Sequence, residues 1–495
     1  MASMSRGIRF RSGGRVVEVA DAHPRATLLD WLRLEARRTG TKEGCGEGDC
    51  GACTVALGRL RDGRIVYEPV NACILLLGQC DGAEIVTVED LAEGGALHPV
   101  QEAMVAHHGS QCGFCTPGIV MSLFTLHEDE ARDPAAPVAR RTIDDALAGN
   151  LCRCTGYRPI VDAARDALAQ PHDPRVRARR EAAARDLAAL ADDDADLFVG
   201  DEIRFFAAPA SAQSLSALYA AHPDATLLAG ATDVGLWITK NLAEIEKVIW
   251  LGRVAGLDAI EETPDRLVLG AMVSHCRAQD RLGAIDPDLG EVMRRFGSAQ
   301  VRASGTVGGN IANGSPIGDL PPALIALGAT LVLESAEGQR RLPLEDFFLA
   351  YRSQDRRPGE WVRAVAVEKL GAADAFRALK VTKRFDEDIS AVMGAFRFAL
   401  DGRRIASARI AYGGMAGTPK RAPAAEAALV GIDLDDPSAF APALDALASD
   451  YTPMSDHRAS AAYRALVARN ILLKALTEIA GADDTRIIAR DPAAA

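Results

Sequence analysis

The sequence lacks the features that would place the protein in a membrane, outside the cell or on a nucleic acid. No apolar run approaches the roughly 20 residues that span a bilayer, and the first nine residues contain no signal-peptide core. The formal net charge of −12 disfavours a nucleic acid or an anionic membrane as partner. We therefore expect a cytoplasmic protein that binds neither nucleic acids nor membranes.

Cysteine is almost absent after the first third of the chain. Nine of the ten cysteines precede residue 155, and neither the tenth, Cys276, nor the nine histidines form a ligand cluster in the sequence. Sulfur chemistry is therefore expected only in the N-terminal part. The 495 residues, 48% of them hydrophobic and 25% charged, have the composition of a soluble globular protein of about three domains.

The cysteine-rich stretch 44–53 has the ligand spacing of a plant-type ferredoxin. It reads C-x4-C-x2-C, and a lone cysteine follows it from a separate apolar segment. The predicted ligands of a 2Fe–2S cluster are Cys45, Cys50, Cys53 and Cys73. Glycines between them allow the loop to curl around a cluster and bring backbone N–H groups to its sulfurs. Zinc and disulfides remain alternatives, although zinc favours paired C-x2-C knuckles and disulfides need an oxidising compartment.

Residues 1–92 predict a small β-grasp-like, ferredoxin-like domain around this loop. A hairpin over residues 7–20 is followed by a helix that Thr27 is expected to cap and Gly40 to end. Strands are predicted at residues 54–57, 64–67 and 84–88. Cys80 lies outside the ligand pattern and is expected to be a packed thiol.

Residues 93–170 predict a compact unit of four helices with a second cysteine set. Apolar faces recur at helical spacing over residues 100–106, 119–126, 143–147 and 160–168. A C-x2-C and a C-x-C pair lie at helix ends, the first just before Thr116 and Pro117, which suit a helix start. The predicted ligands of a second 2Fe–2S cluster are Cys112, Cys115, Cys152 and Cys154. Zinc is an alternative on this spacing alone, and the upstream motif favours iron and sulfur.

Two glycine-containing loops mark the next domain, residues 201–375, which follows a linker at 171–200 with a partly helical pattern and an Asp-rich end. A short strand at 225–228 runs into the first loop, and the same arrangement is expected at 303–310. Such loops can bind a pyrophosphate through backbone N–H and side-chain O–H groups, although neither has the G-x-G-x-x-G pattern. Two of them downstream of one-electron centres favour a flavin.

Residues 376–495 predict a final α+β domain and complete an α+β multidomain chain. Strands are expected near residues 376–381, 391–398 and 404–412, and helices follow them.

The cysteine motifs resemble the iron–sulfur half of the xanthine dehydrogenase/molybdenum hydroxylase family. The resemblance rests on Cys45/Cys50/Cys53/Cys73, on Cys112-Gly-Phe-Cys115-Thr-Pro-Gly and on Cys152-Arg-Cys154-Thr-Gly-Tyr. It implies a ferredoxin-like and a four-helix domain with one 2Fe–2S cluster each, the helical one nearer a molybdenum cofactor. It also implies an α/β FAD-binding domain of the molybdenum-hydroxylase/vanillyl-alcohol-oxidase-like type and a C-terminal α+β flavoprotein domain.

The resemblance extends to the flavin domain residue by residue. Two segments resemble the pyrophosphate-binding segments of the family: Leu227, Leu228, Ala229, Gly230, Ala231, Thr232, Asp233 and Val234, and then Thr306, Val307, Gly308, Gly309 and Asn310. Further positions near the flavin match Phe296, Asp319, Val362 and Lys380. Plainer alternatives are a core aromatic for Phe296, a turn acid for Asp319 and a solvated strand lysine for Lys380. Residues 383–389 resemble the family's loop beside the flavin and nicotinamide sites, or are a solvated charged loop.

The resemblance implies an electron-transfer subunit with no catalytic acid or base of its own. Because the chain ends at residue 495, we expect the molybdopterin-binding domain on a separate large subunit, in an α2β2 heterotetramer. Fusion of clusters and flavin favours a xanthine dehydrogenase, which oxidises hypoxanthine or xanthine to urate and passes electrons through both 2Fe–2S clusters and FAD to NAD+. Alternatives are the equivalent subunit of an aldehyde or N-heterocycle hydroxylase, a non-catalytic metal-binding scaffold, and a stand-alone NADH:acceptor reductase.

Overall fold

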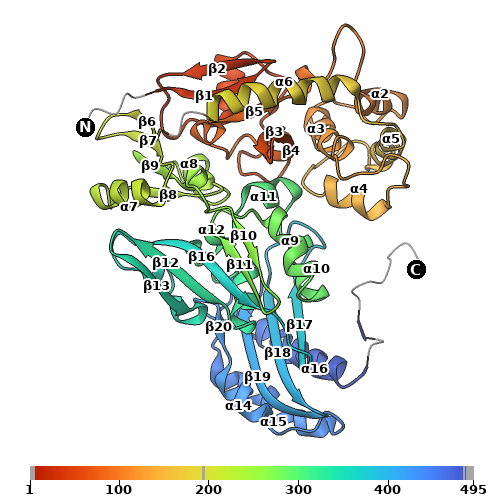
Figure 1. Ribbon diagram of the computed structural model, residues 1–495. Coiled ribbons are helices and arrows are strands. Elements are labelled where there is room, and N and C mark those ends of the chain that lie inside the picture. Colours follow the sequence, from red (N-terminus) through yellow and green to blue (C-terminus); the bar gives the residue numbers. More distant parts are fainter. Residues whose placement is uncertain (1–5, 192–194, 483–484, 487–495) are drawn as a thin grey trace. The chain divides into compact units, whose positions relative to one another are not determined.

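The computed structural model describes residues 6–191, 195–482 and 485–486 (Figure 1). It divides into two compact units, each described by itself below. Unit 1 comprises Met1–Ala255 and Gly297–Gly305, and unit 2 comprises Gly256–Phe296 and Thr306–Ala495. Within the described residues, no helix has both the length and the apolar character needed to cross a membrane.

Unit 1 begins with a five-stranded sheet of order β2-β1-β5-β3-β4, in which β1 and β5 are parallel and the other pairs antiparallel. Its strands are β1 (Ile8–Ser12), β2 (Arg15–Val19), β3 (Thr54–Arg61), β4 (Arg64–Asn71) and β5 (Ala83–Val86). This is the β-grasp arrangement that the sequence predicts. Two short 3-10 helices, η2 (Leu77–Cys80) and η3 (Val88–Asp90), flank β5.

The helix after the first hairpin is shorter than predicted. Thr27 caps α1 (Leu28–Asp30) as expected, but the helix continues only as a π-helical turn, η1 (Trp31–Glu35). It ends there, before Gly40, because Arg37 adopts a left-handed conformation with φ 57° and breaks the helical run.

Four helices follow the sheet, as predicted: α2 (Pro99–Ala106), α3 (Thr116–His127), α4 (Arg140–Leu147) and α5 (Arg158–Leu168). The helix α3 is apolar on almost all sides, and its residues Ile119, Leu123 and Phe124 are fully buried in the core of this bundle. Buried residues from the neighbouring helices, such as Ile143 of α4 and Ile160 of α5, complete that core.

The predicted linker segment contains a long helix, α6 (Pro174–Ala191), that packs against the ferredoxin-like sheet of unit 1 (Figure 1). Its apolar face is buried through Val176, Ala183 and Leu187. Asp186 forms an ion pair with Arg11 of β1, with 2.8 Å between Oδ2 and Nε. The Asp-rich stretch at residues 192–194 lies outside the described residues.

A smaller sheet of order β6-β7-β9-β8 completes unit 1 together with three helices. Its elements are β6 (Leu197–Gly200), β7 (Phe205–Ala208), α7 (Ala212–Ala221), β8 (Thr226–Leu228), α8 (Val234–Thr239), β9 (Lys247–Trp250), the 3-10 turn η4 (Leu251–Arg253) and α11 (Ala299–Ser304). Phe206, Leu228 and Val248 share one hydrophobic core with the ferredoxin-like sheet. The first part of the predicted flavin domain is therefore packed against the ferredoxin-like domain.

Unit 2 contains a five-stranded antiparallel sheet of order β10-β11-β16-β12-β13. Its elements are β10 (Ile260–Glu262), β11 (Arg266–Gly270), α9 (His275–Gly283), α10 (Pro287–Arg294), α12 (Val307–Asn313), α13 (Leu320–Ala326), β12 (Thr330–Ser335), β13 (Gly338–Pro343), η5 (Leu344–Phe347), β14 (Phe348–Ala350), β15 (Ser353–Gln354) and β16 (Trp361–Glu368).

A second sheet of unit 2, of order β17-β18-β19-β20, confirms the predicted C-terminal α+β pattern. Its elements are β17 (Asp374–Val381), β18 (Val392–Asp401), β19 (Arg404–Gly413), β20 (Lys420–Arg421), α14 (Pro423–Leu429), η6 (Pro437–Phe440), α15 (Ala441–Asp450) and α16 (Ala461–Ile479). Phe396, Phe398 and Tyr412 of this sheet pack with the helices in one core. The α+β multidomain class is thus confirmed.

Candidate functional site

The four cysteines of the first motif converge on one point of unit 1. The Cys45 sulfur contacts those of Cys50 and Cys73, and the Cys73 sulfur also contacts that of Cys53. The contacts from Cys50 and Cys73 lower the pKa of Cys45 and so favour its thiolate, the form that binds a metal. Backbone N–H groups of Glu47 and Cys50 both donate to the Cys45 sulfur at 3.4 Å. The loop therefore offers converging sulfurs with N–H donors aimed at them.

The glycines of this loop are required by its backbone. Gly46, Gly48 and Gly51 have positive φ values of 67°, 77° and 68°, a region that other residues rarely adopt. A Cβ at Gly44 would lie 2.7 Å from the Cys50 sulfur. Asn71, at the end of β4, holds the loop from outside, since its side-chain N–H donates to the Gly48 carbonyl at 2.8 Å.

The second cysteine set lies where α3 begins and where the loop before α5 turns. The helix starts at Thr116, directly after Cys115, so Cys115 rather than Thr116 occupies the capping position. Its sulfur contacts that of Cys152, and burial together with this contact raises the pKa of Cys115 to about 12. Cys112 and Cys154 are exposed. The structure therefore brings Cys115 and Cys152 together and leaves the other two sulfurs at the surface.

The first predicted pyrophosphate segment, Leu227–Val234, lies in unit 1 between β8 and α8. A Cβ at Gly230 would come within 1.9 Å of the Ser304 carbonyl oxygen, so only glycine allows this approach. Ala231 has φ 63°, and its carbonyl accepts the Gly235 N–H at 2.7 Å. A short strand thus runs into this loop, as predicted, and the loop leads into the helix α8.

The second predicted segment, Thr306–Asn310, lies in unit 2 and differs from the expected strand-to-loop arrangement. It follows the helix α11 and forms the first turns of α12, and Thr306 caps that helix by accepting the Gly309 N–H at 3.0 Å. A Cβ at Gly308 would lie 2.5 Å from the Ala271 side chain. The side-chain oxygen of Asn310 is buried without a hydrogen-bond partner in the described structure, and a bound ligand could donate to it. Both segments thus have close backbone packing at a glycine.

Asp319 and Lys380 form a buried ion pair, which corrects both plainer alternatives for these residues. Lys380 Nζ lies 2.6 Å from Asp319 Oδ2, and each side chain is only 6% exposed. Ser390 donates to the other carboxylate oxygen of Asp319 at 2.5 Å, and Lys380 also donates to the Arg295 carbonyl at 3.3 Å. Lys380 is therefore not a solvated strand lysine, and Asp319 is more than a turn acid.

The remaining predicted flavin positions lie in different surroundings within unit 2. Phe296 is half-buried just beyond the end of α10, and its ring centroid lies 4.3 Å from that of His275, so it is not a fully buried core aromatic. Val362 is buried in β16. In the loop 383–389, Phe385 is 66% exposed and its carbonyl accepts from Arg295.

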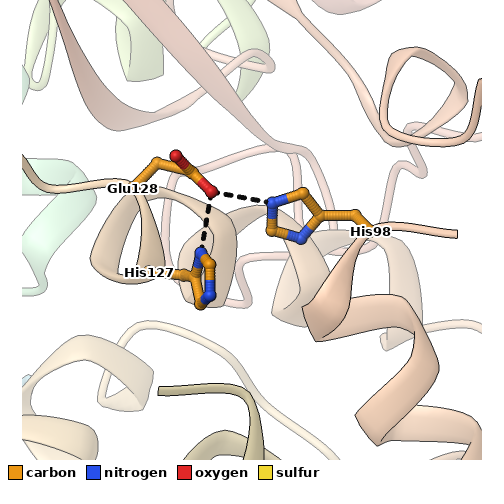
Figure 2. A group of neighbouring side chains, drawn as sticks. All are labelled: His98, His127 and Glu128. Atoms are coloured by element: carbon orange, nitrogen blue, oxygen red, sulfur yellow. Dashed lines mark hydrogen bonds and ion pairs between the residues drawn. The ribbon is translucent and has the colours of Figure 1, made fainter. Parts of the chain in front are cut away.

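Two histidines meet around Glu128, although the sequence predicted no histidine ligand cluster (Figure 2). Glu128 Oε1 lies 2.8 Å from His127 Nδ1 and 3.1 Å from His98 Nε2, and it also accepts the Asp173 N–H at 3.0 Å. His98 Nδ1 accepts the Val100 N–H at 3.2 Å and caps α2. The neutral ring therefore carries its proton on Nε2, where a metal would have to bind. This cluster is better suited to hydrogen bonding than to holding a metal ion.

Sequence reasoning missed Ser390, Asn71 and Glu128, because each acts through a partner distant in the chain. The nearest available signal was the spacing of polar residues within otherwise apolar segments, such as Asn71 just before Cys73. That signal does not identify the partner.

Comparison with protein families matches four consecutive parts of the chain. Residues 11–76 match the family described as 2Fe-2S iron-sulfur cluster binding domain, and residues 87–165 match a 2Fe-2S binding domain. Residues 201–368 match the FAD binding domain in molybdopterin dehydrogenase. Residues 377–479 match the CO dehydrogenase flavoprotein C-terminal domain.

Curated relatives extend this similarity over most of the chain. The xanthine dehydrogenase of Emericella nidulans is 30% identical over 90% of this chain, and that of Drosophila subobscura is 33% identical over 86%. The matched region makes up 36% of each relative, so the chain spans about a third of their length.

Solved structures match slightly more than half of the chain. A carbon monoxide dehydrogenase chain from Hydrogenophaga pseudoflava is 30% identical, with a TM-score of 0.52 over 56% of this chain and 97% of that chain. A chain of quinoline 2-oxidoreductase from Pseudomonas putida is 28% identical, with a TM-score of 0.51 over 55% of this chain and 95% of that one. Together with the two 2Fe-2S matches, these findings show that the chain belongs to the molybdenum hydroxylase family and comprises its iron–sulfur and FAD-binding parts.

Proposed function

We propose that this protein carries electrons from a molybdenum cofactor on a partner subunit to NAD+, during oxidation of hypoxanthine or xanthine to urate. The observation that supports it most directly lies in one compact unit: the four sulfurs of the first cysteine set converge, and Cys115 and Cys152 of the second set meet. The same unit contains the start of the segment that matches a FAD-binding domain. The xanthine dehydrogenases that match most of the chain favour this substrate class.

The cysteines would hold two 2Fe–2S clusters, and clusters of this kind accept and release one electron at a time. One set is Cys45, Cys50, Cys53 and Cys73, and the other is Cys112, Cys115, Cys152 and Cys154. In the first set, the N–H groups of Glu47 and Cys50 would donate to ligand sulfurs and so help set the reduction potential.

A bound FAD would supply hydride transfer to NAD+. Segments 227–234 and 306–310 would hold the pyrophosphate through backbone N–H groups and hydroxyls. Phe296 and Val362 would line the ring. The buried pair of Asp319 and Lys380 would fix the polar side of that site, since a paired lysine keeps one orientation.

The second cysteine set would face the partner subunit. Cys112 and Cys154 are exposed, and the neighbouring apolar side chains of Phe114 and Leu151 are 48% and 53% exposed. A molybdopterin-binding subunit covering this surface would exclude water from the cluster and shorten the electron path. We propose an α2β2 assembly with that subunit, in which this cluster receives electrons first.

A second candidate is the same role for a different hydroxylase substrate. The carbon monoxide dehydrogenase and quinoline 2-oxidoreductase chains that match about half of this chain favour it, because their names give other substrates. The substrate pocket would lie on the partner subunit. Assay of the purified complex with xanthine, an aldehyde and an N-heterocycle distinguishes these cases.

The first experiment is to measure iron, acid-labile sulfide and flavin on purified protein and to record its visible spectrum with NADH. We expect about four irons, four sulfides and one FAD per chain, with NADH bleaching both chromophores. Zinc in place of iron, or no flavin after anaerobic reconstitution, would rule out the proposed electron transfer and favour a non-catalytic metal-binding scaffold.

Two cysteine variants test the first ligand set within the same measurement. Cys73→Ser should lose the first cluster, about half of the iron. Cys80→Ser should keep all of it, because Cys80 is fully buried in the core and burial raises the pKa of its thiol to about 12. Equal iron loss in both variants would refute the assignment of Cys73.

A further inference from the structure

The two cysteine loops are joined directly by a backbone hydrogen bond. The Leu151 N–H donates to the Cys50 carbonyl oxygen at 3.0 Å. Cys50 belongs to the first cysteine set, and Leu151 immediately precedes Cys152 of the second. A path of covalent bonds interrupted by this one hydrogen bond therefore connects the sulfur of Cys50 with that of Cys152.

This contact depends on glycines that let the loops approach backbone to backbone. A Cβ at Gly51 would lie 2.1 Å from the Gly149 carbonyl oxygen, and one at Gly118 would lie 2.1 Å from the Gly51 carbonyl oxygen. Such distances are far below van der Waals contact, so no larger residue fits without separating the loops. The backbones of the two loops therefore lie very close together, and interactions between the loops are needed to keep them there.

The side chain of Gln300 occupies the centre of this contact. It comes from α11 and is only 1% exposed. Its Nε2 lies 3.1 Å from each of three acceptors, Thr54 Oγ1, Ser122 Oγ and Asn150 Oδ1. These three belong to the first cysteine loop's strand, to α3, and to the loop that carries the second cysteine set.

The hydrogen-bond directions in this group are set by the neighbours. The Thr54 hydroxyl donates to the Gly51 carbonyl at 2.7 Å, and the Ser122 hydroxyl donates to Asn150 Oδ1 at 2.7 Å. Both hydroxyl oxygens are therefore left as acceptors, and the Gln300 amide is the donor that they share. Asn150 in turn donates to the Gly51 carbonyl at 3.2 Å.

We propose that Gln300 is a positioning residue that holds the Cys50–Leu151 contact closed and so maintains fast electron transfer between the two cysteine sites. This rests on the function proposed above, because it requires a 2Fe–2S cluster at each site. The step moves one electron, oxidising one centre and reducing the other, with no bond made or broken. Electronic coupling falls steeply as the gap between centres widens, so a small separation of the loops slows the transfer.

Gln300→Leu tests the proposal, because leucine nearly keeps the volume but donates no hydrogen bond. In protein reduced fully with dithionite, we expect weaker magnetic splitting between the two clusters in low-temperature EPR, with full iron content. In rapid-freeze EPR after mixing with NADH, we expect the second site to be reduced at least tenfold more slowly and the first at the normal rate.

Gln79→Leu is the matched control. Gln79 is also buried, at 3% exposure, and also joins two parts of unit 1, since it donates to the Ala229 carbonyl at 3.0 Å and accepts the Leu76 N–H at 2.9 Å. It does not touch the contact between the cysteine loops. Both variants should lower the melting temperature, and only Gln300→Leu should change the magnetic splitting in the dithionite-reduced protein.

Unchanged splitting and rate in Gln300→Leu, with a loss of stability like that of Gln79→Leu, would overturn the proposal and leave Gln300 as a structural residue. If Gln300→Leu loses a cluster, the same measurements on Ser122→Ala test the proposal. This variant removes one of the three acceptors of the Gln300 amide, so it should weaken the splitting and slow the transfer by a smaller amount. The dithionite measurement needs no NADH, so failure of the proposed NAD+ reaction is distinguishable from failure of this inference.

Discussion

Asp286 is a carboxylate whose burial works against its charge. It caps α10 by accepting the Asp288 N–H at 2.8 Å. Burial is the largest cause that raises its pKa from 3.8 to about 6, and the nearby charge of Asp288 adds to it. Between these two values the folded protein binds more protons than the unfolded chain, so this group lowers stability as the pH rises through the window.

We expect Asp286→Asn to remove this penalty, because asparagine caps a helix as well as aspartate does and carries no charge. At pH 7 the variant should be more stable than the natural protein by about 1–3 kcal/mol, with little difference near pH 4. Urea unfolding of unit 2 at several pH values measures it. Asp436→Asn, at an exposed cap that accepts the Ser438 N–H at 3.1 Å, is the control and should change little. A variant less stable than the natural protein at pH 7 would contradict the assignment.

At the scale of elements, Glu128 joins three helices through one carboxylate. Its partners are His98 at the start of α2, His127 in the last turn of α3, and the backbone of Asp173 just before α6. Burial alone would raise its pKa, but the hydrogen bonds from His127, His98 and Asp173 outweigh this and hold the pKa well below its usual range. Its contribution to stability is therefore present above the unfolded value of 4.5 and is lost only in strong acid.

Glu128→Gln should destabilise unit 1 by about 2–4 kcal/mol at neutral pH, because the single oxygen that accepts all three hydrogen bonds would lose its negative charge. Thermal unfolding measures the loss. The control is Glu130→Gln, two residues further along the chain. It removes an exposed ion pair in which Glu130 lies 3.2 Å from Arg180, and it should lower the stability by less than about 0.5 kcal/mol. Equal effects in the two variants would show that Glu128 does not organise these helices.

At the scale of the whole molecule, the cofactor sites are distributed unevenly over the two units. All eight cysteines of the two motifs lie in unit 1, whereas the two predicted pyrophosphate segments lie one in each unit. A bound group stabilises the part of the chain that holds it. Removing iron and removing flavin should therefore loosen different parts of the protein.

Hydrogen exchange measured by mass spectrometry can locate both effects. Removing iron should increase exchange around residues 44–53 and 149–157, and leave β17–β19 of unit 2 unchanged. Removing only the flavin should increase exchange in 227–234 and also in 306–310. Loss of protection confined to one unit after flavin removal would contradict the proposed binding segments.

Local features could be predicted from the sequence because they depend on neighbouring residues. The spacing of cysteines and glycines in 44–53 constrains how that loop can close, and the structure brings its sulfurs together as the spacing requires. The pattern of apolar residues near 376–381, 391–398 and 404–412 likewise predicted strands, and β17, β18 and β19 form there. The pattern failed before Thr306, where a helix replaces the expected strand, because short segments of small residues suit either.

Only the tertiary structure decided which distant polar groups pair. Lys380 and Asp319 are 61 residues apart, and Gln300 and Thr54 are 246 apart, so no local pattern connects them. From the sequence, a lysine or glutamine is expected at the surface, because these residues are seldom buried. When the fold does bury one of them, its polar atoms are paired by hydrogen bonds with other groups. The sequence by itself thus determined the cysteine loops and most strands. The buried pairs and the contact between the two cysteine loops follow from how the domains pack within each unit.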